Sequence, residues 1–220
     1  MPKKNSNKPT QYCKLYLARH GESEGNVLGI IQGHTDFPLT TRGKDQAAIL
    51  ARALEKVSFA AVYSSDLSRA KDTAAAVANQ KQLVVKTTAL LRERHFGEFE
   101  NEATVASQRE LIELLKVHES IVTSERFQKK LREDIESDAE VVARFILFLR
   151  EVAVAYANQN ILVVSHSGMI RALLIHLGVY TYQDFERIKI PNASYIVLES
   201  DGIDFFVKEL VGIQKIPLAE

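Results

Sequence analysis

Apolar residues along the chain gather in short continuous runs, and stretches of helical periodicity separate these runs. The strand-like runs occupy residues 12–18, 60–64, 83–87, 161–165, 194–199 and 203–210. Several runs are unbroken rather than alternating, which is typical of strands that are covered on both faces. Two amphipathic stripes stand out between them: Ala47, Leu50, Ala51 and Leu54, and then Val141, Phe145, Phe148, Leu149, Val152 and Tyr156.

This alternation of strand and helix predicts an α/β fold with a doubly wound, mostly parallel sheet and helices on both faces. The pair Asp201-Gly202 joins the last two runs and is typical of a hairpin, so we expect the sheet to end in an antiparallel strand. Residues 98–138 contain no convincing strand, and their leucines and isoleucines recur at helical spacing among many charges. We expect a single domain over 12–220 with a small helical cap insertion at 98–138, after a flexible tail at 1–11.

Charge and composition narrow the classes of partner. The 220 residues include 28 Lys and Arg and 28 Asp and Glu, so the net charge gives no general attraction to nucleic acid or an anionic membrane. No run approaches the roughly 20 apolar residues that span a bilayer, and residues 1–11 lack the apolar core of a signal peptide. The single Cys13 cannot form an intrachain disulfide, and we expect it to be buried. We therefore expect a cytoplasmic protein with no nucleic-acid or membrane partner.

Two of the apolar runs end in a histidine. Arg19-His20-Gly21 follows the first run, and Ser165-His166-Ser167-Gly168 ends the fourth. Open α/β sheets bind ligands at the carboxyl ends of their strands. Either histidine alone could be a strand-end residue bonded to the backbone, but the pairing favours one composite site.

Phosphoryl transfer is the chemistry that best fits the residues near these histidines. A phosphomonoesterase without a metal needs a nucleophile that is neutral near pH 7, fixed donors for the phosphoryl oxygens and an acid for the leaving group. His20 is the candidate nucleophile and Glu93 the candidate acid. The charged phosphate ligands would be Arg19, Arg69 and His166. Arg69 follows a strand and lies near a helix amino terminus, which favours anions.

Neutral donors would complete the site, and several candidate residues also have a simpler structural interpretation. The neutral donors would be Asn26 and the backbone amides around Gly33, Ser167 and Gly168. Arg69 could instead be a surface arginine, Glu93 a solvated carboxylate and Asn26 a turn residue. A metal site formed by His20, His166 and Glu93 is disfavoured, because two neighbouring guanidinium groups would repel the ion.

Several blocks in order carry a resemblance to a known family. They are Arg19-His20-Gly21-Glu22-Ser23 with Asn26, Gln32-Gly33, Ser64-Ser65-Asp66-Leu67-Ser68-Arg69-Ala70, Leu91-Arg92-Glu93-Arg94-His95-Phe96-Gly97, Ser165-His166-Ser167-Gly168 and the turn Pro191-Asn192-Ala193-Ser194. Together they resemble the histidine phosphatase superfamily, the phosphoglycerate mutase-like clan, over nearly the whole chain.

This resemblance implies roles for individual residues. His20 would become a phosphohistidine, Arg19, Arg69 and His166 would bind the phosphate, and Glu93 would donate the proton. No metal or other cofactor is expected. The further phosphate- or substrate-binding residues would be Ser23, Asn26, Gln32, Gly33, Arg94, Ser167 and Gly168.

Departures from the mutase pattern indicate the phosphatase branch. Mutases in the clan usually carry Tyr in place of Phe96, Lys near Thr104 and adjacent arginines in the cap, and these groups are missing here. The resemblance thus implies a phosphoric monoester hydrolase for small phosphorylated metabolites. A cofactor-dependent phosphoglycerate mutase and a non-catalytic phosphate-binding module remain alternatives, and a homodimer remains open.

Two departures concern the cap itself. Asn101 replaces a Gly that is usual in the phosphatase branch, and no Pro-Gly-Gly precedes Glu136-Ser137. The resemblance therefore does not imply a cap geometry or a particular substrate.

Overall fold

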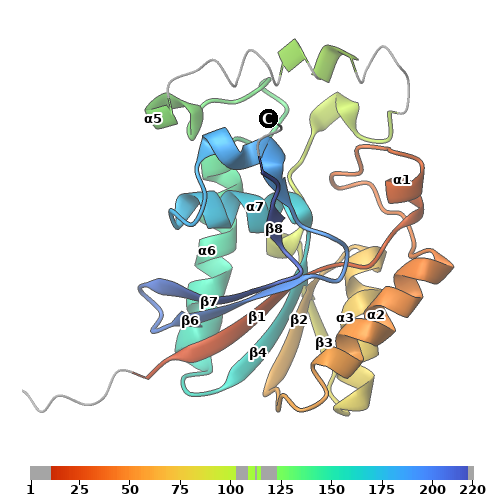
Figure 1. The fold of residues 1–220 in the computed structure, drawn as a ribbon, viewed down its shortest axis with the longest axis vertical. Coiled ribbons are helices and arrows are strands. Elements are labelled where there is room, and N and C mark those ends of the chain that lie inside the picture. The colour runs from red at the N-terminus through yellow and green to blue at the C-terminus, as the bar shows by residue number, and fades with distance from the viewer. Residues whose placement is uncertain (1–10, 103–108, 112, 115–122, 218–220) are drawn as a thin grey trace, which may run out of the picture.

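A central six-stranded sheet organises the computed structural model, which describes residues 11–102, 109–111, 113–114 and 123–217. The strand order is β3-β2-β4-β1-β6-β7, with β3, β2, β4 and β1 parallel and β6 and β7 each antiparallel to the strand before it (Figure 1). Each predicted strand and the predicted antiparallel hairpin are confirmed. The strands are β1 (Cys13–Arg19), β2 (Ala61–Ser65), β3 (Val85–Thr88), β4 (Asn160–Ser165), β6 (Tyr195–Ser200) and β7 (Phe205–Val211).

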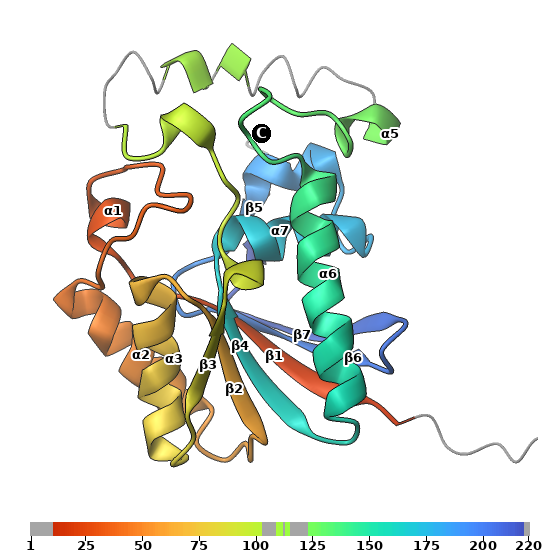
Figure 2. The same cartoon turned by 180° about the vertical axis from the view of Figure 1, so that it is seen from behind.

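Helices cover both faces of this sheet. The helices α2 (Thr41–Ala53) and α3 (Ser68–Gln80) lie on one side, and α6 (Asp138–Ala155) and α7 (Ser167–His176) lie on the other (Figures 1 and 2). The predicted doubly wound α/β fold is confirmed. Of the helices in the described ranges, none combines the length and the apolar character that crossing a bilayer requires.

Alternation along the central strands divides the apolar core into two layers. Leu15 and Leu17 of β1 pack in the cluster with α6 and α7, whereas Ala18 packs with α2 and α3. Leu162 and Val164 of β4 join Ala18 in the second cluster, and all five side chains are 0% exposed. Because both faces are covered, both alternating sets must be apolar, which explains the continuous runs in the sequence. Cys13 also lies in the core, as expected.

Short elements lie beyond the carboxyl ends of the parallel strands (Figure 1). They are α1 (Glu24–Val27), α5 (Thr123–Arg126) and the 3-10 turns Ala89–Leu91 and Gly97–Phe99. A third small apolar cluster there joins Phe99, Leu111 and Ile135. The predicted cap at 98–138 lies partly outside the described residues, and the predicted tail lies there almost entirely, so both stay predictions.

A second, two-stranded sheet was not predicted. The strands β5 (Ile188–Lys189) and β8 (Gln214–Lys215) pair antiparallel, after the 3-10 segment Tyr182–Arg187. Strands of two residues leave no hydrophobic period in a sequence, because alternation needs a longer run to be recognised.

Candidate active site

His20 and His166 lie side by side at the carboxyl ends of neighbouring strands. The parallel register pairs Arg19 of β1 with Ser165 of β4. The residues that follow them, His20 and His166, are therefore about one strand spacing apart. The ring centroids are 5.0 Å apart with an interplanar angle of 60°. The structure therefore brings together the two histidines that the sequence placed in one site.

The ring of His20 is oriented by its own neighbour. Its Nδ1 lies 2.6 Å from the carbonyl oxygen of Gly21. A carbonyl oxygen only accepts, so Nδ1 carries the proton and Nε2 keeps its lone pair. Burial, together with Arg19 and Arg69, lowers the pKa of His20 well below 6.5, although the Gly21 carbonyl opposes this shift. His20 is thus a neutral imidazole at pH 7 with an unprotonated Nε2.

His166 is a buried polar ring without a partner of its own. It is 0% exposed, and neither ring nitrogen has a hydrogen-bond partner among the described residues. Burial, followed by the charge of Arg69, lowers the pKa of His166 well below 6.5. An unsatisfied buried polar group is costly, and a ligand oxygen that accepts its N–H would remove that cost.

The guanidinium groups of half-buried Arg19 and of buried Arg69 are directed to the same place. Nη1 of Arg19 donates to the carbonyl oxygen of Ile190 at 2.6 Å. Arg69, 1% exposed, donates to the carbonyl oxygens of Thr35 and Gly33 at 2.9 Å each. The Nε atoms of both arginines are buried without a partner among the described residues. Burial lowers the pKa of Arg19 to about 10 and also lowers that of Arg69, so both remain cationic at pH 7.

The carboxyl group of Glu93 is held by two backbone amides. Oε1 accepts the N–H of Arg94 and Oε2 accepts the N–H of Gly168, at 2.9 Å each. A Cβ at position 168 would lie 2.3 Å from Oε1 of Glu93. Only glycine permits this contact, so Gly168 contributes both a donor and the space for the carboxyl group.

A pocket of about 230 Å³ brings together Arg19, His20, Arg69, Glu93 and Gly168. Asn26 also lines this pocket. Its amide oxygen accepts hydrogen bonds from the Ser23 N–H at 3.1 Å and from the side-chain NH2 of Asn192 at 3.3 Å, so its own NH2 group can donate to a ligand. The pocket is lined by Arg19, His20, Asn26, Ile30, Ile31, Gln32, Gly33, Arg69, Glu93, Phe96, Ser167, Gly168 and Arg171.

Three of the expected binding residues do not line this pocket: His166, whose ring is buried beside that of His20, Ser23 and Arg94. Ser23 is fully buried, donates to Oε1 of Gln32 at 2.7 Å and caps α1 by accepting the Asn26 N–H. The guanidinium of Arg94 pairs with the buried carboxylate of Asp138. In this arrangement Ser23 orders Gln32 and Asn26, and Arg94 is paired with Asp138, so the direct substrate contact expected of both residues stays a prediction.

Arg171 is a pocket residue that the sequence reasoning missed. It lies in α7, four positions after Ser167, so the two side chains share a face of the helix. Its Nε is buried without a partner among the described residues. Burial lowers the pKa of Arg171, and the nearby carboxylate of Glu93 opposes that shift. The four-residue spacing from Ser167 indicates that Arg171 lies on the same helix face, but only once residues 167–176 are recognised as a helix.

The donor set around His20 suits an anion. Three guanidinium groups and an amide NH2 line a pocket that also holds a neutral nitrogen nucleophile and a carboxyl group. The imidazole of His166, without a partner among the described residues, is buried beside that nucleophile. Within the described ranges, no group of three or more His, Cys, Asp and Glu side chains is arranged to hold a metal ion. The site can therefore bind a phosphoryl group, attack it and exchange a proton with a leaving oxygen.

Comparisons with known proteins agree with this geometry. Residues 15–211 match the family model of the histidine phosphatase superfamily (branch 1). The chain is 36% identical over 167 residues to an adenosylcobalamin/alpha-ribazole phosphatase of Escherichia coli K12, covering 74% of this chain and 78% of that protein. It is 33% identical over 189 residues to phosphoserine phosphatase 1 of Hydrogenobacter thermophilus, covering 86% and 87% respectively.

A solved structure extends the similarity to three dimensions. The mycobacterial glucosyl-3-phosphoglycerate phosphatase in complex with VO3 superposes with a TM-score of 0.75 at 27% identity, covering 90% of this chain and 98% of that one.

Proposed function

The chain belongs to the histidine phosphatase superfamily, and on that premise we propose that it hydrolyses phosphomonoesters of small metabolites through a phosphohistidine on His20. One observation carries the proposal. The Nδ1–H of His20 is directed to the Gly21 carbonyl, so Nε2 is the free nucleophile in a pocket lined by Arg19 and Arg69. No metal or other cofactor is needed for this chemistry.

In the first step, Nε2 of His20 attacks the phosphorus atom in line with the ester oxygen. The phosphorus–oxygen bond breaks, the leaving oxygen takes a proton from Glu93, and a phosphorus–nitrogen bond forms. The ring becomes cationic, and the Gly21 carbonyl 2.6 Å from Nδ1 stabilises that charge. Arg19, Arg69 and His166 bind the oxygens of the transferred group.

In the second step, water attacks the same phosphorus atom from the side that the alcohol has left. The water gives a proton to the carboxylate of Glu93, the phosphorus–nitrogen bond breaks, and inorganic phosphate leaves. Glu93 is thereby returned to its acid form and His20 to its neutral form. The neutral donors for both steps would be Asn26, Gln32 and the backbone amides around Gly33 and Ser167, while the N–H of Gly168 holds the carboxyl group of Glu93.

We further propose that residues 98–138 act as a cap over this pocket within the single domain 12–220. In support, Phe99 and Ile135 pack in one apolar cluster with Ile31 and Phe96, two side chains that line the pocket. The enzyme would work in the cytoplasm, where a free thiol such as that of Cys13 stays reduced.

A phosphoglycerate mutase is less favoured as an alternative. Phe96 lines the pocket with a ring that cannot donate a hydrogen bond, where mutases of the clan usually carry Tyr. A phosphate-binding module without turnover would share the pocket, and a turnover measurement separates it from an enzyme.

The experiment is hydrolysis of a chromogenic aryl phosphate in the presence of a chelator. The unmodified protein should turn the ester over, and His20→Ala should lose at least about 10³-fold in kcat. His176→Ala, at the far end of α7, is the matched control and should retain activity. Undiminished turnover by His20→Ala would refute the nucleophile. Binding of inorganic phosphate without turnover of any ester in a metabolite panel would select the binding module.

A further inference from the structure

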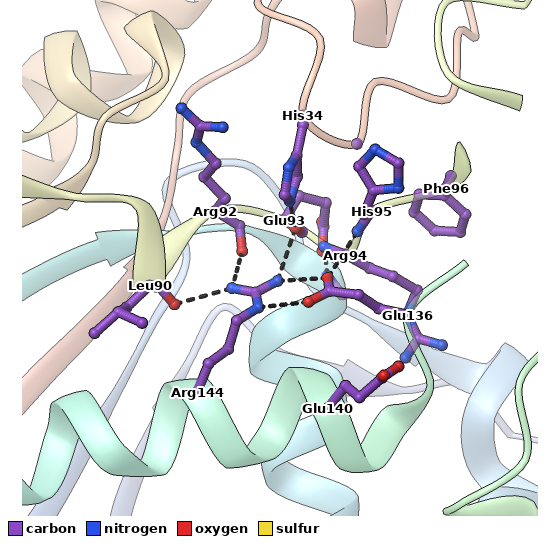
Figure 3. A network of polar contacts seen from close by, with 12 residues as sticks. His34, Leu90, Arg92, Glu93, Arg94, His95, Phe96, Glu136, Glu140 and Arg144 are labelled. Atoms are coloured by element: carbon purple, nitrogen blue, oxygen red, sulfur yellow. Dashed lines mark hydrogen bonds and ion pairs between the residues drawn. The ribbon is translucent and has the colours of Figure 1, made fainter. Parts of the chain in front are cut away.

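The guanidinium group of Arg144, in α6, donates hydrogen bonds to the segment that carries Glu93 (Figure 3). Nη1 donates to the carbonyl oxygens of Leu90 at 2.9 Å and Arg92 at 2.7 Å, and Nη2 donates to that of Glu93 at 2.9 Å. Nε and Nη2 also donate to the carboxylate of Glu136, at 2.8 Å each. Every N–H group of the guanidinium therefore has one acceptor.

Glu136 completes this cluster from the other side. Its Oε2 accepts the N–H of His95 at 2.8 Å, and its own N–H donates to the carbonyl oxygen of His95 at 3.1 Å. Burial alone would raise the pKa of Glu136, but the bonds from Arg144 and from the His95 N–H outweigh burial and lower it. Glu136 is thus a carboxylate at pH 7, and its bonds to Arg144 are charge-assisted.

The start of α6 sets the spacing between the two partners. The Ser137 hydroxyl caps the helix by accepting the N–H of Glu140 at 3.2 Å, and the Glu140 carboxylate accepts the N–H of Ser137 at 2.9 Å. Glu136 therefore lies just before the helix, and Arg144 follows about two turns later on the same side. This arrangement gives a function to the Glu136-Ser137 pair that the sequence left without one.

The segment around Glu93 needs such support from outside. Residues 92–96 belong to no helix or strand, so no ladder of backbone bonds fixes them. The carbonyl oxygen of Glu93 lies 2.9 Å from Nε2 of His34 and 2.9 Å from Nη2 of Arg144 (Figure 3). Arg144 thus fixes the main chain of Glu93, while the carboxyl group stays free of Arg144 and faces Gly168.

We propose that Arg144, held by Glu136, is a positioning residue that places the carboxyl group of Glu93 within reach of the leaving oxygen. The inference rests on the acid role proposed for Glu93 above. Proton transfer requires a donor within hydrogen-bond distance, so a small shift of the 92–96 segment would slow protonation more than phosphate binding. A cluster that only stabilised the fold would affect every ester equally.

Leaving-group dependence separates these two roles. Glycerol phosphate has an alkoxide leaving group that needs a proton, whereas 2,4-dinitrophenyl phosphate has a phenolate that leaves without one. We expect Arg144→Lys and Arg144→Gln to lower kcat/KM, which reports the first step, by about 10²-fold on glycerol phosphate and by less than about threefold on the dinitrophenyl ester. Glu136→Gln should show the same selectivity to a smaller extent.

Controls make each result decisive. Arg150→Gln is the matched control on the same helix, because Arg150 donates to the exposed carbonyl oxygen of Ile203 instead, and it should show no selectivity. Equal losses on both esters, or no loss, in the folded Arg144→Lys and Glu136→Gln variants would overturn the positioning role. Selectivity in Glu93→Gln but not in these variants would leave the acid in place and reject Arg144 alone. Absence of selectivity in Glu93→Gln would reject the acid role and the inference with it.

Discussion

His20 and His166 face each other with ring centroids 5.0 Å apart, at the ends of two strands that are joined in parallel. Both rings are buried beside arginines, so the fold holds two neutral imidazoles where a solvent-exposed pair would titrate near pH 6.5. Because its ring is neutral, His20 keeps a nucleophilic nitrogen. The ring nitrogens of His166 have no hydrogen-bond partner in the part of the chain that the structure describes, so its N–H is available to a ligand oxygen.

This buried pair should make folding stability depend on pH. The folded pKa of each histidine lies well below the unfolded value, so between the two values only the unfolded state binds a proton. Stability should therefore be highest above about pH 6.5 and fall as the pH drops toward 5, by up to about 1.4 kcal/mol per pH unit for each histidine. Urea unfolding between pH 5 and 8 measures the slope.

A variant isolates the contribution of one ring to that slope. His166→Gln should show a shallower dependence than the unmodified protein, whereas His95→Gln, which alters a half-exposed ring outside the pair, should not. Identical slopes in all three proteins would mean that the pair is not held neutral by the fold.

Gly168 should be essential for activity but not for folding. A Cβ there would lie 2.3 Å from Oε1 of Glu93, so Gly168→Ala displaces the acid. We expect kcat on an alkyl phosphate to fall by about 10²-fold with the melting temperature nearly unchanged, because alanine is a good helix former. Gly178→Asn, at a left-handed position with nothing within 4 Å of a Cβ, serves as the control. Full activity of Gly168→Ala would place Glu93 elsewhere during catalysis.

Asn101 occupies a left-handed position, with φ of 63°, and its N–H donates to the carbonyl oxygen of Ile31 at 3.0 Å. Asn tolerates this conformation better than other non-glycine residues, which explains how it replaces the usual Gly. Asn101→Ala should lower the free energy of unfolding by about 1 kcal/mol, and Asn101→Gly should be neutral or slightly stabilising. Denaturant midpoints test this, and equal stabilities for the two variants would contradict it.

Cys13 should be unreactive in the native protein. It is 0% exposed, and burial raises the pKa of its thiol to about 11. At pH 8 we expect a disulfide reagent to modify it at least about 10²-fold more slowly than in concentrated urea. Rapid native modification would show that β1 opens readily at its start.

The sequence predicted the sheet and its two histidines because these depend on local patterns. An unbroken apolar run identifies a strand buried on both faces, and a histidine directly after it must lie at the sheet edge. The partners of each residue were not predictable in this way. Arg94 was expected at the substrate, yet it pairs with Asp138, 44 positions further along the chain. Such a pairing depends on how α6 packs, which no local pattern records.

Residues beyond the strand ends were predicted less completely for the same reason. Arg171 and Arg144 act from helices, and their roles depend on helix rotation relative to the sheet. The chemistry of their side chains was visible in the sequence, but the direction in which each side chain points was not.

The most direct test of the account is to trap the phosphorylated enzyme and identify the modified atom. Rapid quenching with a phosphate-labelled ester, followed by mass spectrometry and phosphorus NMR of the peptides, should find the label on Nε2 of His20, since Nδ1 is engaged by Gly21. His20→Ala should carry no label. A label on Nδ1, on His166 or on any other residue, or turnover without any covalent intermediate, would contradict the account.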